Sequence, residues 1–258
     1  MIITHKIPWN QCLSHTIWPC IEKGWKDNGS EIHFFWGLAG NNKKEIQNCI
    51  KNDKEWWYVD NGYLTEQITR YPAPIIHESN KTYFRICKGA LHSENLKPSS
   101  GVRRKELIDK GIDCQFKGWK KEGEYVLLCP SSPDIVYWHH AYNQNRWTIE
   151  AKKNLDETFV FRNKPRPNNE WWNTDIKDDL EKCKYLICDM SLASVDAIVN
   201  GVPVICDPRN VAAPLSSSKN DIVYHEEGTV NSWLDSLADN QFTLDEISNG
   251  TAYQTLEK

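Results

Sequence analysis

Two serines and an aspartate lie close together at the start of a predicted helix. The run KYLIC at 184–188 has the composition of a buried strand, and Ser191 follows it as a good N-cap residue. Ser194 and Asp196 then fall in the first turns of the helix. Because a helix start presents unpaired N–H groups and a positive dipole end, this spacing predicts phosphate binding, with Asp196 near a ribose hydroxyl. The simpler alternative makes Ser191 an N-cap only and Asp196 a solvated acid.

Two more polar groups follow predicted strands in the same half of the chain. Ser131 and Ser132 come after the run YVLLC and directly before a Pro-Asp pair that is typical of a helix start. Arg162 and Lys164 lie at the end of the next apolar run, ETFVFR. Since the carboxyl ends of parallel strands share one edge of a sheet, we expect these side chains to bind the phosphates of the same ligand. A serine turn and a solvated basic loop are the alternatives.

The carboxylate of Asp60 is the first candidate for a catalytic base. It ends the strand-like run EWWYVD and precedes an Asn-Gly turn. A carboxylate at the carboxyl end of a strand can take the proton from an acceptor hydroxyl, which is the role of a general base. His92, which follows the run YFRICKGAL, is the second candidate. In the alternative interpretation Asp60 only caps the turn.

Basic residues are concentrated between residues 85 and 121, although the formal net charge of the chain is -4. Phosphate contacts from such a cluster would position a nucleic acid, and the aromatic residues among them would stack on an unpaired or flipped base. The pattern therefore predicts a face that binds double-stranded DNA, whereas the alternative is a solvated basic face that serves solubility. The predicted contact residues are Arg85, Lys88, Arg103, Arg104 and Lys105.

The second half of the chain alternates short apolar runs with helical segments. Such alternation favours a parallel sheet covered by helices on both faces, that is, a doubly wound α/β domain. The predicted strands are 125–129, 157–162, 184–189, 201–206 and 221–225, and the predicted helices are 134–153, 175–183 and 191–200.

The first half is less regular but similar in kind. Helices are predicted near 13–25, 42–52 and 103–111, and strands at 31–37, 55–60 and 83–87. The polar, glycine-bearing stretch 111–124 is interpreted as a linker, and a helical tail is predicted after about residue 229. We therefore expect two Rossmann-like α/β lobes, 1–122 and 123–258, with a cleft between them.

Composition excludes several classes of protein. In 258 residues, 40% of them hydrophobic, no apolar run is long enough to span a membrane, and the N-terminal residues lack the layout of a signal peptide. The nine cysteines are odd in number and contain no C-x-x-C pair, which indicates thiols that pack in a reducing cytoplasm. The adjacent His139 and His140 point about 100° apart on a helix and cannot easily share one ion, so no essential metal is predicted.

The run SVDAIVNGVPV at 194–204 resembles the donor-site motif of GT-B glycosyltransferases, S/T-x-x-E-A-x-x-x-G-x-P-V. The match includes Ala197, Gly201 and Pro203, with Asp196 where Glu is more usual and Ala193 at the hydroxyl position. The resemblance implies that the hydroxyl residue and nearby amides contact the donor's phosphates, that the acid contacts its ribose, and that transfer needs no bound metal ion. A cation such as Arg162 is similar to the diphosphate ligand of capsule-type GT-B enzymes.

A second resemblance concerns the segments WWYVDNGY, YFRICKGALH and WLDSLADNQFTLDEISNG. They are similar to small glycosyltransferase-like proteins of tailed phages, some of which decorate modified DNA bases. The first lobe would then bind the acceptor and the second the donor, most simply a UDP-sugar used as co-substrate without a bound cofactor. The expected reaction is sugar transfer to a hydroxylated or hydroxymethylated pyrimidine of phage DNA, in the cytoplasm of an infected bacterium. The alternatives are a glycan or lipid-linked acceptor, a sugar-nucleotide epimerase, and a non-catalytic nucleotide-binding module.

Overall fold

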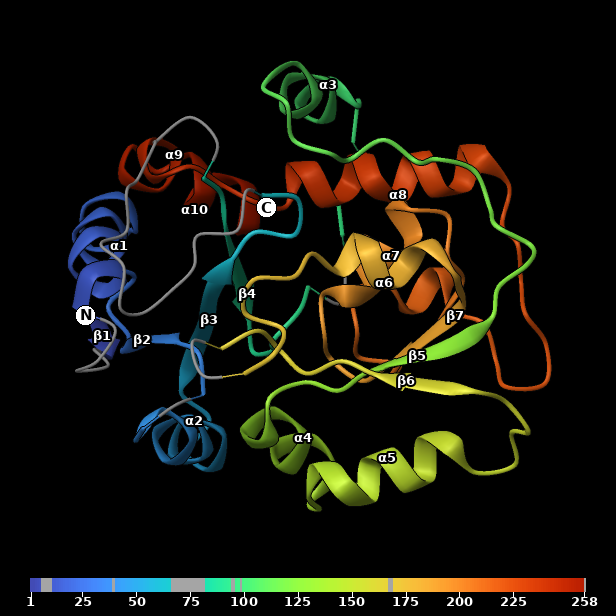
Figure 1. The fold of residues 1–258 in the computed structure, drawn as a ribbon. Coiled ribbons are helices and arrows are strands. Elements are labelled where there is room, and N and C mark those ends of the chain that lie inside the picture. Colours follow the sequence, from blue (N-terminus) through green and yellow to red (C-terminus); the bar gives the residue numbers. More distant parts are fainter. Residues whose placement is uncertain are drawn as a thin grey trace. The chain divides into compact units, whose positions relative to one another are not determined.

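The computed structural model describes residues 1–5, 11–38, 40–65, 82–93, 96–97, 99–166 and 169–257, with side chains in the first helix described from residue 16. The chain divides into two compact units, of which the first comprises Met1–Ile112 and Asp235–Lys258 and the second Asp113–Leu234. Each unit contains a four-stranded sheet with helices (Figure 1). The predicted α/β class is confirmed. No described helix is long and apolar enough to cross a membrane.

The sheet of the first unit has the strand order β1-β2-β3-β4. Strands β1 (Ile2–His5), β2 (Ile32–Trp36) and β3 (Glu55–Asn61) are parallel, whereas β4 (Phe84–Lys88) runs antiparallel to β3. The strand β1 is not predicted from the sequence, and within the described residues Ile2–His5 pair with Ile32–Phe35 of β2. The carboxyl ends of β1, β2 and β3 therefore lie at one edge of this sheet, where Asp60 is located.

Helices cover both faces of the first sheet (Figure 1). On one face α1 (Gln11–Gly24), α9 (Leu244–Ser248) and α10 (Thr251–Leu256) pack against alternate residues of the strands, as the period of a strand requires. Helix α2 (Asn42–Lys51) lies on the other face, and α3 (Val102–Asp109) follows β4. The buried residues of the first face include Trp18, Ile21, Phe34, Trp57, Val59, Ile86, Phe242 and Ile247.

The second sheet is entirely parallel, with the order β6-β5-β7-β8. Its strands are β5 (Tyr125–Cys129), β6 (Phe159–Phe161), β7 (Cys183–Cys188) and β8 (Val204–Ile205). Because the chain leaves β5 toward β6 and then returns to the other side of β5, the order reverses between β5 and β7. This reversal is the topological switch point, where open α/β sheets bind ligands.

Helices cover both faces of the second sheet (Figure 1). Helices α4 (Pro133–His140) and α5 (Gln144–Lys152) lie on one face, and α6 (Ile176–Glu181) and α7 (Ala193–Val199) on the other. After β8 follow a short 3-10 helix at Ala213–Leu215 and helix α8 (Glu227–Asp239). Sequence-based predictions of the parallel strands 125–129, 157–162, 184–189 and 201–206 are confirmed within a few residues.

Three predictions differ from the structure. The segment 221–225 is not a strand, because only Asp221 forms a bridge, to Ser218 in a local turn. The helix predicted at 134–153 is divided at Ala141, whose φ of 56° is left-handed, and α5 then starts after the N-cap Asn143. Residues 235–258 belong to the first unit rather than the second, since α9 and α10 pack on its core, and the units divide after Ile112 rather than at 122.

Candidate functional site

The loops that follow β5 and β7 are joined at the switch point of the second sheet. Cys129 and Cys188, the last residues of these strands, are register partners. Two residues after Cys129, the backbone N–H of Ser131 donates a hydrogen bond of 2.7 Å to Oδ1 of Asp189. Asp189 is fully buried and Ser131 is 5% exposed. The switch point is therefore a fixed structure built around a buried carboxylate.

Two polar atoms of this structure lack a protein partner. Within the described part of the chain, the hydroxyl Oγ of Ser131 and the carboxylate Oδ2 of Asp189 have no hydrogen-bond partner. Burial raises the pKa of Asp189, while the hydroxyl and the backbone N–H of Ser131 lower it, so the hydroxyl lies near the carboxylate without the geometry of a hydrogen bond. Because an unsatisfied buried polar group costs about 1–3 kcal/mol, such atoms are rare in folded proteins. A polar ligand that pairs with both atoms would recover this cost.

Ser194, predicted to bind the donor's phosphates, instead braces the loop after β7. It is fully buried, and its hydroxyl lies 3.0 Å from the carbonyl of Ser191 and 3.0 Å from Oδ1 of Asn210. Asn210 in turn donates through Nδ2 to the carbonyl of Asp189 at 2.7 Å. The hydroxyl of Ser194 is thus used inside the protein, which does not favour the phosphate contact predicted for this residue.

Ser191 and Ser132 lie at less buried positions beside the switch point. Oγ of Ser191 accepts a hydrogen bond of 3.3 Å from the N–H of Ala193, while Leu192 is the N-cap residue of α7. Ser132 is the N-cap residue of α4 by backbone conformation, but its side chain makes no capping hydrogen bond. Pro133 follows at the first helical position, as predicted. The loop after β5 therefore offers hydroxyls and the start of α4 at one place.

Asp196 lies on α7, which packs beside α6. Burial, and then the negative charge of Asp175, raise the pKa of Asp196 to about 6, while the positive charge of Lys177 opposes the shift. Burial thus disfavours the charged form of Asp196 relative to an exposed carboxyl group, although a group with a pKa of about 6 is still mainly ionised at pH 7. The ribose contact that the resemblance implies for Asp196 stays a prediction.

The raised pKa gives Asp196 a pH-dependent effect on stability. The folded state binds this proton more tightly than the unfolded chain, so the contribution of Asp196 falls as pH rises from about 4 through 6. Asp196→Asn should raise the free energy of unfolding at pH 8 by about 1–2 kcal/mol, after allowance for partial exposure, and give no gain at pH 4. Urea unfolding at the two pH values measures this, with the exposed Asp134→Asn as control. An equal effect of Asp196→Asn at both pH values would contradict the assignment.

Arg162, predicted to bind phosphate, is instead held by the protein. It is 5% exposed, and its guanidinium pairs with Asp179 and donates to the hydroxyl and carbonyl of Thr174, each at 3.0 Å. It lines a hollow of about 260 Å3 whose other residues are mainly acidic. Such a lining repels a diphosphate, so the structure does not support Arg162 as its ligand. Lys164 is exposed, and its carbonyl accepts from Nδ2 of Asn169 at 3.0 Å.

Asp60 and His92, the two predicted bases, both belong to the first unit. Asp60 Oδ2 accepts from the hydroxyl of Tyr58 at 2.8 Å and from Nη2 of Arg85 at 3.0 Å, and its side chain is 23% exposed. His92 is only 2% exposed, with its ring edge-on to Tyr63 at 6.1 Å. Asp60 is therefore oriented at the strand end and reachable by solvent, whereas His92 is enclosed.

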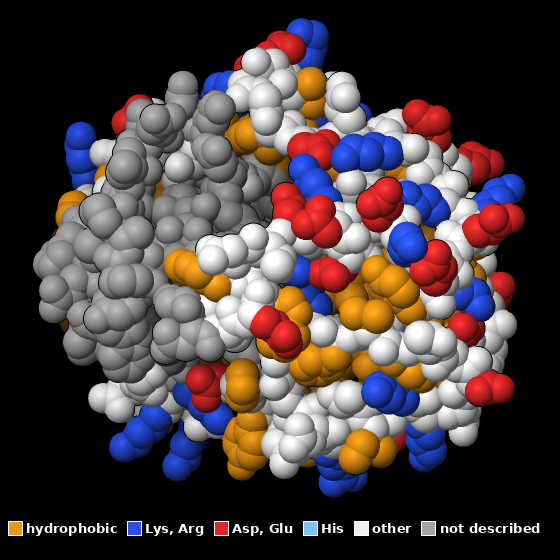
Figure 2. All heavy atoms as spheres, in the orientation of Figure 1, with side chains coloured by type: hydrophobic (Ala, Val, Ile, Leu, Met, Phe, Trp, Pro, Cys, Tyr) orange, Lys and Arg blue, Asp and Glu red, His pale blue; other side chains and the backbone are white. Residues whose placement is uncertain are grey.

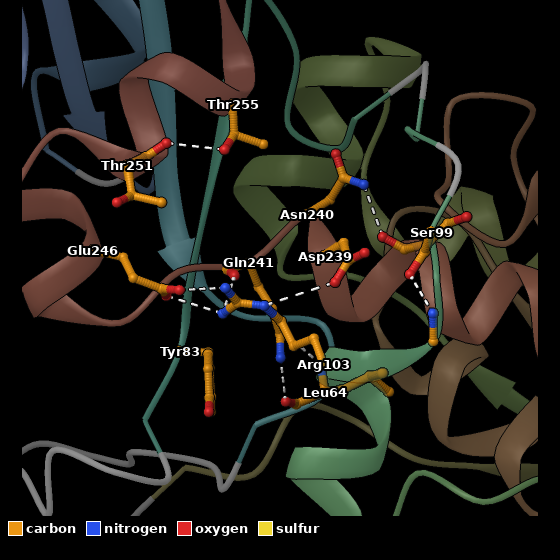
Figure 3. Close-up of polar contacts among 12 residues, drawn as sticks. Leu64, Tyr83, Ser99, Arg103, Asp239, Asn240, Gln241, Glu246, Thr251 and Thr255 are labelled. Carbon is orange, nitrogen blue, oxygen red and sulfur yellow. Dashed lines mark hydrogen bonds and ion pairs between the residues drawn. The ribbon is translucent and has the colours of Figure 1, made fainter.

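The predicted DNA-binding residues have acidic or carbonyl partners in their own unit. Arg85 is 4% exposed and lies against Asp60 and the carbonyls of Asn61 and Leu91, so it is not available to a phosphate. Arg103 pairs with Glu246 and Asp239 beside Gln241 (Figure 3). The remaining pairs are Arg104 with Asp235, Lys88 with Glu257 and Glu55, and Lys105 with Asp109. On the described part of the face in Figure 2, acidic and basic side chains are interspersed.

Sequence reasoning missed the residues that complete the switch point. Asp189 and Asp207 follow β7 and β8, and His140 ends α4. The sequence held a signal for these acids, because Asp189 and Asp207 both come directly after apolar runs. The sequence alone does not show which of the two carboxylates is buried. Among the residues that the structure describes, no group of His, Cys, Asp and Glu side chains is arranged to hold a metal ion.

Comparison with known proteins shows a similar fold in solved structures. No protein-family model matches the sequence, and the comparison with curated proteins found no match. A solved structure named Thermosulfurimonas dismutans KpsC, beta Kdo 2,4 transferase, has a TM-score of 0.52 at 12% identity, with 93% of this chain and 90% of that chain covered. A second, named Thermosulfurimonas dismutans KpsC, beta Kdo 2,7 transferase, has a TM-score of 0.49 at 11% identity, covering 100% and 99%. The chain thus has the α/β fold of a solved sugar transferase.

Proposed function

We propose that the protein is a glycosyltransferase that moves a sugar from a nucleotide-sugar donor to an acceptor hydroxyl. The observation that carries the proposal is the switch point of the second sheet, where Ser131 and Asp189 present buried polar atoms without protein partners among the described residues. The fold shared with the beta Kdo 2,4 transferase supports the same reaction class. The nucleotide phosphates would bind at the loop after β5, next to Ser131, Ser132 and the N–H groups at the start of α4.

The proposed reaction needs one nucleophile, one leaving group and one base. The acceptor oxygen forms a bond to the anomeric carbon of the donor sugar, and the bond from that carbon to the phosphate oxygen breaks, with its electron pair leaving on the nucleotide. N–H groups at the start of α4 would stabilise the charge that grows on the leaving phosphate. The proton of the acceptor hydroxyl passes to a base, for which Asp60 is the proposed residue because its oriented side chain is partly exposed.

The acceptor is proposed to be a carbohydrate hydroxyl rather than a DNA base. Binding to DNA draws its affinity from cations that neutralise phosphates. In the first unit Arg85, Arg103 and Arg104 already pair with Asp60, Glu246 and Asp235, and replacing these partners by phosphates would leave the acids unpaired. A sugar hydroxyl makes no such demand for positive charge.

Nucleotide binding gives the first test. A thermal-shift screen with UDP-, GDP-, CMP- and dTDP-sugars should reveal at least one ligand that raises the melting temperature, because binding to the native state stabilises it. For that ligand, Ser131→Ala should weaken binding about 5- to 30-fold in calorimetry, the size of a charge-assisted hydrogen bond of about 1–2 kcal/mol. This variant should lose less than about 1 kcal/mol of unfolding free energy, because the hydroxyl of Ser131 makes no hydrogen bond of good geometry in the described chain and only lies near the carboxylate of Asp189.

Ser194→Ala is the matched control for this test. It removes a buried hydroxyl that is hydrogen-bonded, so it should lower the free energy of unfolding by about 1–2 kcal/mol and leave nucleotide affinity unchanged. Equal affinity of the wild type and Ser131→Ala would remove the loop after β5 from the donor site. Binding without release of sugar to any acceptor would indicate a non-catalytic module, and interconversion of UDP-sugars without an acceptor would indicate an epimerase.

A further inference from the structure

His140 occupies a position between two carboxylates at the same edge of the second sheet. Its Nε2 lies 4.0 Å from Oδ2 of Asp189 and 3.9 Å from Oδ2 of Asp207. The imidazole side chain is 18% exposed, and its ring stacks on Tyr142 with centroids 5.1 Å apart. In the chain as described, Nε2 of His140 has no hydrogen-bond partner. The imidazole is thus held by stacking on Tyr142, and its Nε2 could still form a hydrogen bond with a ligand.

Both carboxylates are fixed as well. Oδ1 of Asp189 accepts from the N–H of Ser131, which leaves Oδ2 directed elsewhere. Asp207 accepts from Nε and Nη2 of Arg209, each at 2.8 Å. Burial raises the pKa of Asp207, but the hydrogen bonds from Arg209 outweigh it and hold the pKa at about 2. Near neutral pH Asp207 is therefore an anion, a strong acceptor at a fixed place.

The two distances are too long for direct hydrogen bonds but suit an inserted oxygen. A hydroxyl oxygen about 2.8 Å from each of two atoms can bridge them when they are 4.0 Å apart. Since Nε2 of His140 and Oδ2 of Asp189 are both closed to solvent, the side chains around them must move apart to admit it. A hydroxyl donates one hydrogen bond and accepts another, so it can donate to Asp189 and accept from the imidazole of His140. The adjacent hydroxyl of the same ring can donate to Asp207. Carboxylates cannot accept from a phosphate oxygen, which lacks a hydrogen, so this group selects hydroxyls.

We infer that His140, Asp189 and Asp207 form a subsite that binds a pair of adjacent hydroxyls of the ligand, with His140 positioning the first. The inference rests on the proposed function, since the loop after β5 would hold the phosphates of the same molecule. The hydroxyl pair has two sources in a nucleotide-sugar, the ribose and the transferred sugar. If the pair belongs to the ribose, its hydroxyls are held by His140 on α4 and by the acids that follow β7 and β8, rather than by Asp196 on α7.

Calorimetric titration of the full chain distinguishes these sources. The probes are UDP, CDP and GDP, their 2′-deoxy forms, and the corresponding nucleotide-sugars. If the pair belongs to the ribose, the wild type should bind the ribonucleotide about 10-fold or more tightly than the 2′-deoxy form, the size of a hydrogen bond to a charged group. If it belongs to the transferred sugar, the same preference should separate the nucleotide-sugar from the free nucleotide.

Variants of the subsite should remove that preference. His140→Phe keeps the stacking on Tyr142 but loses the nitrogen, and it should reduce the affinity ratio to about 3-fold or less, with His140→Gln as a second variant if the first fails to fold. His139→Phe, which changes the neighbouring ring 6.5 Å away, is the matched control and should keep the ratio of the wild type.

The outcomes separate the inference from the proposed function. If the wild type binds a nucleotide and neither ratio changes in the folded His140 variants, the subsite is overturned while the donor site stands. The same conclusion follows if His139→Phe alone removes the preference. If no nucleotide or nucleotide-sugar binds the wild type, the proposed function is overturned and the subsite with it.

Discussion

Replacement of Arg85 by alanine is expected to lower the free energy of unfolding by about 3–5 kcal/mol, the cost of leaving a buried charge without its partner. Arg85 is 4% exposed on β4, and Nη2 lies 3.0 Å from the carboxylate of Asp60. Its guanidinium also lies over the rings of Tyr58 and Tyr63, 5.6 Å from each centroid. Burial disfavours the charge, but Asp60 and the two tyrosines hold the pKa of Arg85 above its usual range.

Urea unfolding of purified variants measures this effect. Lys105→Ala is the control, because Lys105 is exposed and, among the described residues, forms its ion pair with Asp109 one helical turn away, so its loss should cost less than about 0.5 kcal/mol. The double variant Asp60→Asn with Arg85→Met should lose less than the sum of the single changes, since both charges leave together. A loss below about 1 kcal/mol for Arg85→Ala would show that the pair is solvated in the native protein.

The contrast between Arg85 and Lys105 shows why the basic cluster could not be interpreted from the sequence. Composition counts charges along the chain, whereas the partner of a charge is set by folding. Arg103 lies 143 residues from its partner Glu246, and that carboxylate also completes the capping box of α9 with Thr243. No local sequence pattern connects positions so far apart. The acidic partners of the basic residues between 85 and 121 could therefore not be predicted from the sequence.

Strands and helices were predictable where periodicity and turn residues agree. The run YVLLC between Gly123 and Pro130 forms β5, and the segment 191–200 forms α7 with Gly201 after it at a φ of 75°. At Gly201 a Cβ would meet the carbonyl oxygen of Gly118 at 1.8 Å, a long-range reason for glycine that the sequence hides. Secondary structure was not predicted where it depends on tertiary contacts. Strand β1 is an example, because it is formed by pairing with β2.

The candidate site shows the same division. The sequence predicts that Ser131 and Ser191 follow strands, because both come within three residues of the end of an apolar run. It does not predict which hydroxyl turns inward to a protein partner. Ser194 finds that partner in Asn210, which lies beyond β8, whereas Ser131 finds none within the described residues. Residue type and spacing thus indicate where the candidate site lies. Packing determines which hydroxyl is hydrogen-bonded within the protein and which is not.

Replacement of Asp60 by asparagine is expected to lower kcat of sugar transfer by about 10²- to 10⁴-fold, the usual effect of losing a general base. The amide keeps the shape of the carboxylate and can still accept from Tyr58 and Arg85, but it cannot take a proton from the acceptor hydroxyl. Affinity for the donor nucleotide should stay within about twofold, because the proposed donor residues belong to the second unit.

The pH profile of kcat separates this catalytic role from a structural one. A base that must be ionised gives the wild type an acid limb, which should vanish in Asp60→Asn, whereas a change that only loosens the fold lowers the whole profile. Tyr58→Phe is the matched control, because it removes one hydrogen bond of 2.8 Å to the same carboxylate and leaves the base in place. It should lower kcat less than about tenfold and keep the acid limb. Full activity of a folded Asp60→Asn protein would exclude Asp60 and leave His92, whose 2% exposure would then require the surrounding loop to open before an acceptor could reach it.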